Sequence, residues 1–126
     1  MADDMKKKIF VVDDDVMNRK LSVDLLELHG MCAVTAQSGQ ELLQMLKTET
    51  PDLILMDINL PDMDGFELFK AVRAKEKSRS VKVIAWTALA MREEQEKIRA
   101  AGFDRCIIKP IETKKFVQEV RDLLAA

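Results

Sequence analysis

The stretch LILMDINLPDMDG, residues 53–65, decides the fold because it places a carboxylate at the end of an apolar run. The first four residues predict a strand buried on both faces. The run is followed by a cluster of residues typical of the loop that ends a strand: Asn59, Pro61, Asp62, Asp64 and Gly65. Asp57 stands between strand and loop, where an aspartate is either a turn residue or a functional carboxylate.

The length and composition predict a single domain over residues 1–126. Lys and Arg total 20 against 22 for Asp and Glu, so no basic surplus favours direct nucleic-acid binding. No apolar run approaches the roughly 20 residues that cross a bilayer, and the amino terminus lacks the apolar stretch of a signal peptide. We therefore expect a cytoplasmic protein without membrane insertion, in which Cys32 and Cys106 are reduced thiols.

Short apolar segments recur along the chain and predict five strands. They are IFVV (9–12), CAVTA (32–36), LILM (53–56), VKVIAW (81–86) and RCII (105–108). Stretches with helical periodicity lie between them. In the first of these stretches, Met17, Leu21, Leu25 and Leu28 predict the apolar face of a helix, and Gly30 is placed to end that helix.

The later helices carry capping and periodicity signals. Ser38 with Glu41, and Asp64 with Glu67, have the spacing of a capping box at the start of a helix. Residues 88–101 predict a charged helix, whose thin apolar face comprises Ala90, Met91, Ile98 and Ala101. The buried stripe predicted for the last helix consists of Phe116, Val120 and Leu123.

Five alternations of strand and helix predict an α/β fold, a doubly wound parallel sheet with helices on both faces and right-handed crossovers. Ligands of such sheets bind at the carboxyl ends of the strands. The predicted strands end in Asp13 to Asp15, in Asp57, in Thr87 and in Lys109, with only a helix cap at Ser38 after the second strand. If the first and third strands are neighbours, as in the order 2-1-3-4-5, their carboxylates converge.

Converging carboxylates favour a bound cation because like charges packed together cost free energy. Magnesium suits Asp13, Asp14 and Asp57, since it takes oxygen ligands and leaves positions for phosphate oxygens. Zinc is poorly supported, because His29 is the only histidine and the cysteines form no paired ligand motif. We interpret His29 as a residue near a helix C-terminus rather than a phosphate carrier.

Lys109 and Thr87 complete the set needed for phosphoryl transfer. A lysine neutralises one phosphoryl oxygen and a hydroxyl donates to another, while a carboxylate such as Asp57 is the nucleophile. Each residue also has a structural alternative. Asp14 or Asp15 can cap the first helix, Thr87 can cap the fourth, and Lys109 can be a solvated surface charge.

The motifs VVDDD (11–15), LILMDINLPDMDG (53–65), WTALA (86–90) and IIKPI (107–111) closely resemble those of the receiver domain of bacterial two-component response regulators. The resemblance covers residues 6–125 and implies the flavodoxin-like (βα)5 fold with strand order 2-1-3-4-5. It implies that Asp57 is the phospho-acceptor, which takes its phosphoryl group from a sensor histidine kinase or a histidine phosphotransfer protein.

The resemblance also assigns the remaining site residues. Magnesium is held by Asp13, Asp14, Asp57 and the backbone carbonyl of Asn59, partly through water. Thr87 moves onto the phosphoryl group, and Lys109 pairs with that group in the active form. The peptide bond between Lys109 and Pro110 is expected to be cis, as in relatives.

Two comparisons with relatives modify these expectations. Many relatives carry an aromatic residue three positions before the lysine, where this chain has Cys106, so the usual coupling between site and surface is altered. Asn59 and Leu89 occupy the positions, two residues beyond Asp57 and Thr87, that set the lifetime of the aspartyl phosphate in relatives. An apolar Leu89 is expected to hinder water and prolong that lifetime.

These observations favour a stand-alone response regulator, which is not an enzyme but a phospho-acceptor that switches partner binding or relays phosphate. Its output surface is expected to be the face formed by the fourth helix, fifth strand and fifth helix, with Leu89 and Met91 either as contacts there or packed on the sheet.

A receiver fragment of a hybrid histidine kinase is an alternative. A haloacid-dehalogenase-like phosphatase is less favoured, because it needs an aspartate where Asn59 stands. A flavin-binding protein is disfavoured, because Asp13 to Asp15 would repel the flavin phosphate.

Overall fold

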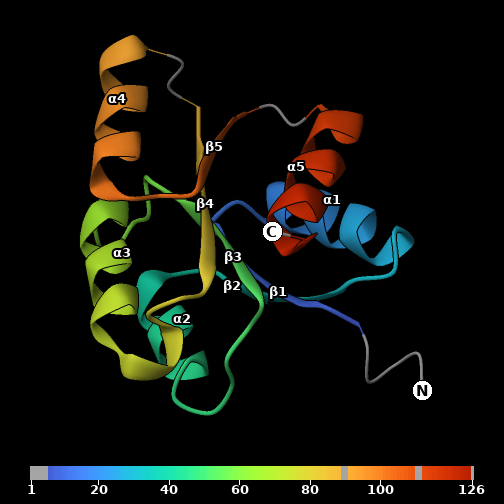
Figure 1. The fold of residues 1–126 in the computed structure, drawn as a ribbon, viewed down its shortest axis with the longest axis horizontal. Coiled ribbons are helices and arrows are strands. Elements are labelled where there is room, and N and C mark those ends of the chain that lie inside the picture. The colour runs from blue at the N-terminus through green and yellow to red at the C-terminus, as the bar shows by residue number, and fades with distance from the viewer. Residues whose placement is uncertain (1–5, 89–90, 110–111, 126) are drawn as a thin grey trace.

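The computed structural model describes residues 6–88, 91–109 and 112–125, and within them strands and helices alternate as expected (Figure 1). The strands are β1 (Lys8–Val12), β2 (Cys32–Ala36), β3 (Leu53–Asp57), β4 (Lys82–Thr87) and β5 (Arg105–Ile108). The helices are α1 (Val16–Leu28), α2 (Gly39–Met45), α3 (Gly65–Ala74), the short 3-10 helix η2 (Glu76–Ser78), α4 (Arg92–Ala101) and α5 (Thr113–Ala125).

All strand pairs are parallel, and the strand order is β2-β1-β3-β4-β5, which confirms the predicted α/β fold. The strand β3 lies at the centre and all five of its residues are buried, so the strand predicted from the run LILM is confirmed and also includes Asp57. Its neighbours β1 and β4 fix its register, with Val12 opposite Met56 and Asp57 opposite Trp86. The carboxyl ends of β1, β3 and β4 therefore meet at one edge of the sheet.

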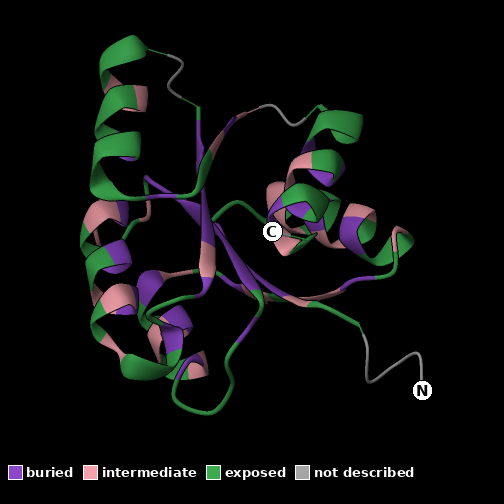
Figure 2. Cartoon of the chain, in the orientation of Figure 1, coloured by how far each residue is buried: buried purple, intermediate pink, exposed green. Residues whose placement is uncertain are grey.

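The helices form two layers, one on each face of the sheet (Figures 1 and 2). On one face, Leu26 of α1 and Phe116 of α5 pack with Ile84 and Trp86 of β4. The other face is covered by α2, α3 and α4. Burial follows these layers, since the strands are largely buried and the outer faces of the helices are exposed (Figure 2).

The apolar face predicted for α1 is packed only in part, through Leu25, which lies against the core on this side of the sheet. Met17 is 69% exposed and Leu28 is 78% exposed, and Leu21 is also exposed. The residues that α1 buries are Ser22 and Leu26. Ser22 tolerates burial because its hydroxyl donates to the backbone carbonyl of Asn18 at 2.8 Å. Of the predicted face, Leu25 therefore contributes to the packing, whereas Met17, Leu21 and Leu28 are exposed.

The other helices agree more closely with the sequence. Ser38 caps α2 and Asp64 caps α3, each accepting from a backbone N–H of the first turn. The helix α4 begins at Arg92, later than the predicted residue 88, and Met91 is exposed at its start. The predicted stripe of α5 is buried throughout: Phe116, Val120 and Leu123. None of the helices in the described residues has both the length and the apolar character needed to cross a membrane.

Candidate functional site

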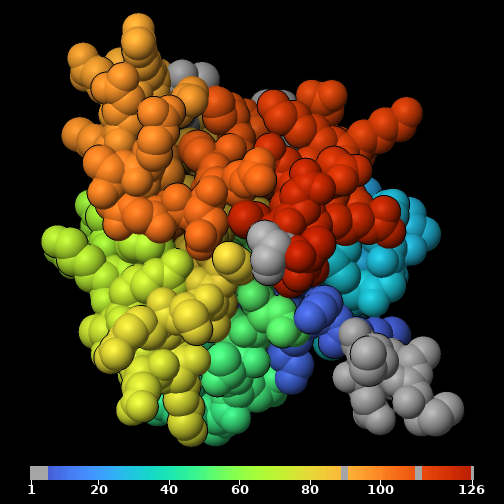
Figure 3. Space-filling view, viewed as in Figure 1, coloured from blue at the N-terminus to red at the C-terminus, as the bar shows by residue number. Residues whose placement is uncertain are grey.

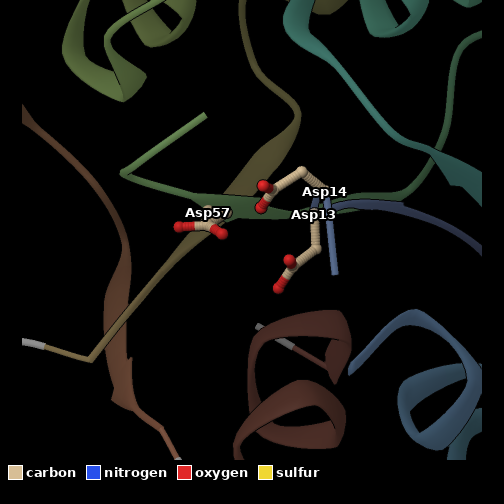
Figure 4. A group of neighbouring side chains, drawn as sticks. All are labelled: Asp13, Asp14 and Asp57. Atoms are coloured by element: carbon tan, nitrogen blue, oxygen red, sulfur yellow. The ribbon is translucent and has the colours of Figure 1, made fainter. Parts of the chain in front are cut away.

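Three carboxylates gather at the carboxyl edge of the sheet (Figure 4). Asp13 and Asp14 follow β1 directly, and Asp57 is the last residue of the neighbouring strand β3. One oxygen from each of these side chains lies within 4.8 Å of the other two. Asp13 and Asp57 are buried, whereas Asp14 is exposed. The structure therefore brings together the three acids that the sequence placed at strand ends.

Backbone hydrogen bonds hold the two buried carboxylates in place. Asp13 Oδ1 accepts from the N–H of Asp15 at 2.8 Å, and Asp57 Oδ1 accepts from the N–H of Asn59 at 2.9 Å. Asp15 is the residue that caps α1, where it accepts from the N–H of Met17. The cap alternative therefore holds for Asp15, which leaves Asp13 and Asp14 to face the site.

Lys109 joins the two buried acids. Its Nζ lies 2.9 Å from Asp13 Oδ2 and 2.9 Å from Asp57 Oδ2. The backbone N–H of Lys109 donates to the carbonyl of Thr87 at 2.8 Å, which fixes the end of β5 against the end of β4. The alternative that Lys109 is a solvated surface charge is therefore wrong, because its ammonium group is mostly enclosed between carboxylates.

One ammonium group does not neutralise three carboxylates. Burial raises the pKa of Asp57 above its ordinary value, the negative charge of Asp13 adds to this rise, and hydrogen bonds from Lys109 and Asn59 oppose it. Burial alone would lower the pKa of Lys109, but its hydrogen bonds to Asp57 and Asp13 raise that pKa. The site therefore keeps a cation and an excess of negative charge at close range.

Thr87 is fully buried at the end of β4, at the same edge as Asp57. The neighbouring backbone is tied to this edge, since the N–H of Ile58 donates to the carbonyl of Trp86 at 3.0 Å. The helix α4 is capped at Met91 rather than at Thr87, so the alternative that Thr87 caps this helix is wrong.

The loop after Asp57 is held by contacts that sequence reasoning missed. Both oxygens of the Asp62 carboxylate accept from the first turn of α2, Oδ1 from the N–H of Gly39 and Oδ2 from the N–H of Gln40, each at 2.9 Å. These hydrogen bonds lower the pKa of Asp62. Gly65 closes the loop, because its N–H donates to the carbonyl of Ile58 and an added Cβ would lie 2.6 Å from the Ile58 Cα.

The donor set fits magnesium. The three side chains offer carboxylate oxygens, which hard divalent cations prefer. Among the described residues, no histidine or cysteine belongs to a group that could hold a metal ion. The carboxylate charge that Lys109 does not neutralise favours the binding of a divalent cation at this site.

The fold and the acidic site define a class of doubly wound α/β domains that bind their ligand at the carboxyl ends of the strands. Residues 9–121 match the family model of the response regulator receiver domain. The chain belongs to this family, and its function is that of a response regulator in two-component signalling. Membership of this family argues against the alternative of a haloacid-dehalogenase-like phosphatase.

Individual relatives agree with this assignment. The chain is 39% identical over 120 residues to the polar-differentiation response regulator DivK of Brucella ovis, covering 95% of this chain and 98% of that protein. The chemotaxis response regulator CheY4 of Vibrio cholerae has a similar structure, with a TM-score of 0.88, 26% identity, and coverage of 94% of this chain and 98% of that one.

A third relative bears on the metal. The receiver domain of the sensor histidine kinase PA1611 of Pseudomonas aeruginosa has a TM-score of 0.88 and 26% identity, and the alignment covers 96% of this chain and 99% of that one. That receiver has a magnesium ion coordinated in its active-site cleft. Receiver domains thus bind magnesium at an acidic cluster of the kind formed by Asp13, Asp14 and Asp57.

Two sequence expectations fall outside the described residues. They are the cis peptide bond at Pro110 and the role of Leu89 in the lifetime of the phosphorylated form. Cys106, which replaces the expected aromatic residue, is a half-buried free thiol on β5. Burial raises the pKa of this thiol.

Proposed function

We propose that Asp57 is the phospho-acceptor and that its phosphorylation switches the protein between partners. The observation that carries this proposal is the Asp57 carboxylate itself. It is only 3% exposed, lies at the open edge of the sheet and shares the Lys109 ammonium group with Asp13. A nucleophile beside a fixed cation suits phosphoryl transfer, in which catalysis is chiefly positioning and charge stabilisation.

The donor is a phosphohistidine of a sensor histidine kinase or a histidine phosphotransfer protein. A carboxylate oxygen of Asp57 forms the new P–O bond as the P–N bond to the donor imidazole breaks, and the electron pair of that bond stays on the nitrogen. Lys109 then neutralises a phosphoryl oxygen, and Thr87 donates its hydroxyl to another. The domain itself catalyses this transfer and the later hydrolysis of the acyl phosphate.

Magnesium would be held by Asp13, Asp14, Asp57 and the backbone carbonyl of Asn59. It would supply positive charge to the phosphoryl oxygens. The excess of carboxylate over lysine charge supports this assignment.

The phosphoryl donor docks on α1, which follows the acidic residues directly. Val16, Met17 and Leu21 expose apolar side chains on this helix, with 63% of Val16 exposed. Exposed apolar residues that flank a polar site are typical of protein interfaces. A donor that covers them would bring its histidine to the edge where Asp57 lies.

The output leaves through the face formed by α4, β5 and α5. In Figure 3 the side chains of α4 and α5 cover the upper part of the visible face. Met91 is 62% exposed at the start of α4, which favours a contact role over packing on the sheet. The proposal includes a cytoplasmic location, supported by the two unpaired thiols of Cys32 and Cys106.

The phospho-acceptor is tested through the single tryptophan, Trp86. Addition of beryllofluoride or acetyl phosphate with magnesium should change its fluorescence, and the change should disappear in Asp57→Asn and in EDTA. Asp52→Asn is the matched control, because Asp52 lies just before β3 at the opposite end of the strand, and it should respond as the wild type does. An unaltered response in Asp57→Asn would contradict the proposal.

The docking surface has its own test. Leu21→Lys should slow transfer from a phosphorylated donor while leaving the acetyl phosphate reaction unchanged, because the small molecule needs no docking helix. Leu28→Lys changes an equally apolar and more exposed residue at the far end of α1 and serves as the control. Equal transfer rates in the two variants would place the docking surface elsewhere.

A further inference from the structure

Lys109 has a third neighbour besides the two carboxylates. Its Nζ lies 5.1 Å from the centroid of the Trp86 ring, on the ring face. Trp86 is the residue of β4 before Thr87 and is fully buried. A lysine ammonium group over a tryptophan face is attracted by the ring quadrupole, and the attraction is stronger where water is excluded. Trp86 therefore helps to fix the only cation that contacts Asp57 in the described residues.

The polar part of Trp86 does not explain its place in the core. Its Nε1 is buried and has no hydrogen-bond partner within the described part of the chain. A buried N–H without a partner costs free energy, and a phenylalanine or leucine at this position would avoid that cost. The feature that sets the indole apart is its large aromatic face, which is the part that Lys109 contacts.

Trp86 also connects the lysine to a helix. The ring of Phe116 in α5 packs edge-on against it, with ring centroids 6.3 Å apart and an interplanar angle of 69°. Phe116 is buried, and its N–H donates to the carbonyl of Glu112, the residue before α5. The contacts therefore run from Asp57 through Lys109 and Trp86 to α5.

We propose that Trp86 is a positioning residue, which holds Lys109 between Asp13 and Asp57 and couples the lysine to α5 through Phe116. This inference rests on the proposed phosphorylation of Asp57. When phosphoryl oxygens draw the ammonium group toward Asp57, the ring loses part of its cation contact. The packing of Phe116 then changes. The buried pair of Trp86 and Phe116 transmits the signal in a chain that has Cys106 where many relatives carry an aromatic residue.

The test exploits the single tryptophan, because fluorinated tryptophan can replace Trp86 alone during biosynthesis. Fluorination weakens the ring quadrupole with little change in shape. The rate of Asp57 phosphorylation by acetyl phosphate should fall stepwise with each added fluorine, by about two- to tenfold in total. Trp86→Phe, which keeps an aromatic face, should lose less activity than Trp86→Leu.

Lys109→Ala provides the coupled control. Its own rate will be lower, but fluorination of Trp86 should have no further effect in that background, since the cation is gone. A structural role of the ring would instead give the same stepwise loss with and without Lys109. The ¹⁹F signal of the labelled ring should also move when beryllofluoride and magnesium are added, and the Phe116→Leu variant should reduce that movement.

The outcomes separate this inference from the proposed function. If Asp57 is phosphorylated at one rate across the fluorinated series, the role of Trp86 is overturned and the proposed function stands. If the unmodified protein is not phosphorylated, the proposed function fails, and the role of Trp86 in phosphoryl transfer fails with it. The contact itself is then measured separately, as a ring-current shift of the Lys109 side-chain protons that disappears in Trp86→Leu.

Discussion

Replacing Asp57 with asparagine should stabilise the protein when no divalent cation is present. The ionised carboxylate is buried beside Asp13 and Asp14, and its oxygens lie within 4.8 Å of theirs. Asparagine has nearly the same shape and keeps one acceptor oxygen, which can replace the acceptor for the N–H of Asn59 or the acceptor for Lys109, since these donors contact different oxygens of Asp57. The substitution therefore removes a charge with little change in packing.

The magnitude follows from the distances. At an effective dielectric constant of about 20, each repulsion between carboxylates within 4.8 Å amounts to about 3 to 4 kcal/mol, and the attraction to Lys109 at 2.9 Å to about 6 kcal/mol. Attraction and repulsion nearly cancel, so the cost of burying the charge remains. We expect Asp57→Asn to raise the free energy of unfolding by about 1 to 3 kcal/mol in EDTA at neutral pH.

The raised pKa of Asp57 also predicts that Asp57→Asn increases the free energy of unfolding at neutral pH. The native state binds a proton at this carboxyl more tightly than the unfolded chain does, so the stability that it contributes is complete below the ordinary pKa of 3.8. That contribution is lost as the pH rises through the higher folded-state pKa. At neutral pH the side chain is in its less favourable, ionised form, and asparagine stands in for the neutral form.

The assay is urea unfolding in EDTA and again with magnesium. Asp57→Asn should have the higher midpoint in EDTA with an unchanged slope, which indicates a change in stability alone. Magnesium should stabilise the wild type more than the variant, because one ligand has been lost. A variant that is less stable than the wild type in EDTA would refute the reasoning about the excess charge.

Two further predictions concern the loop after β3. Gly65→Ala should lower the free energy of unfolding by about 1 to 3 kcal/mol in urea titrations, because its Cβ would lie 2.6 Å from the Ile58 Cα; an unchanged midpoint would mean that the loop yields without cost. Asp62→Ala should cost about 0.5 to 1 kcal/mol at neutral pH, because it removes the acceptor for the N–H groups of Gly39 and Gln40. Since the folded-state pKa of Asp62 is lowered, its contribution to stability is present above the ordinary pKa of 3.8 and disappears as the pH falls through the folded-state pKa. If wild type and Asp62→Ala still differ in stability in acid, the charge of Asp62 is excluded as the cause.

The central strand and its edge could be predicted from the sequence because their signals are local. An unbroken apolar run ending in Asp57 requires a strand buried on both faces, and parallel strands bring Asp13 and Asp14 to the same edge. The face of α1 could not be predicted from periodicity. One of the two residues that α1 buries is Ser22, whose hydroxyl donates within the helix, and a serine is not counted as apolar in a periodicity pattern.

The other features that the sequence did not predict depend on contacts between residues far apart in the chain. The Asp62 carboxylate accepts a hydrogen bond from Gly39, which is 23 positions away in the sequence, and the spacing of the two residues does not predict that contact. The position of Trp86 beneath Lys109 likewise depends on the pairing of β4 with β5. The sequence predicted only that Trp86 lies in a strand.

The most direct test of the central claim is to locate the phosphoryl group. The protein should be incubated with acetyl phosphate and magnesium, treated with borohydride to reduce the acyl phosphate to a stable alcohol, and digested for mass spectrometry. Asp57 should be the reduced residue, and its reduction should depend on magnesium. Modification of Asp13 or Asp14 instead, or no modification at residue 57 in a folded protein, would contradict the central claim.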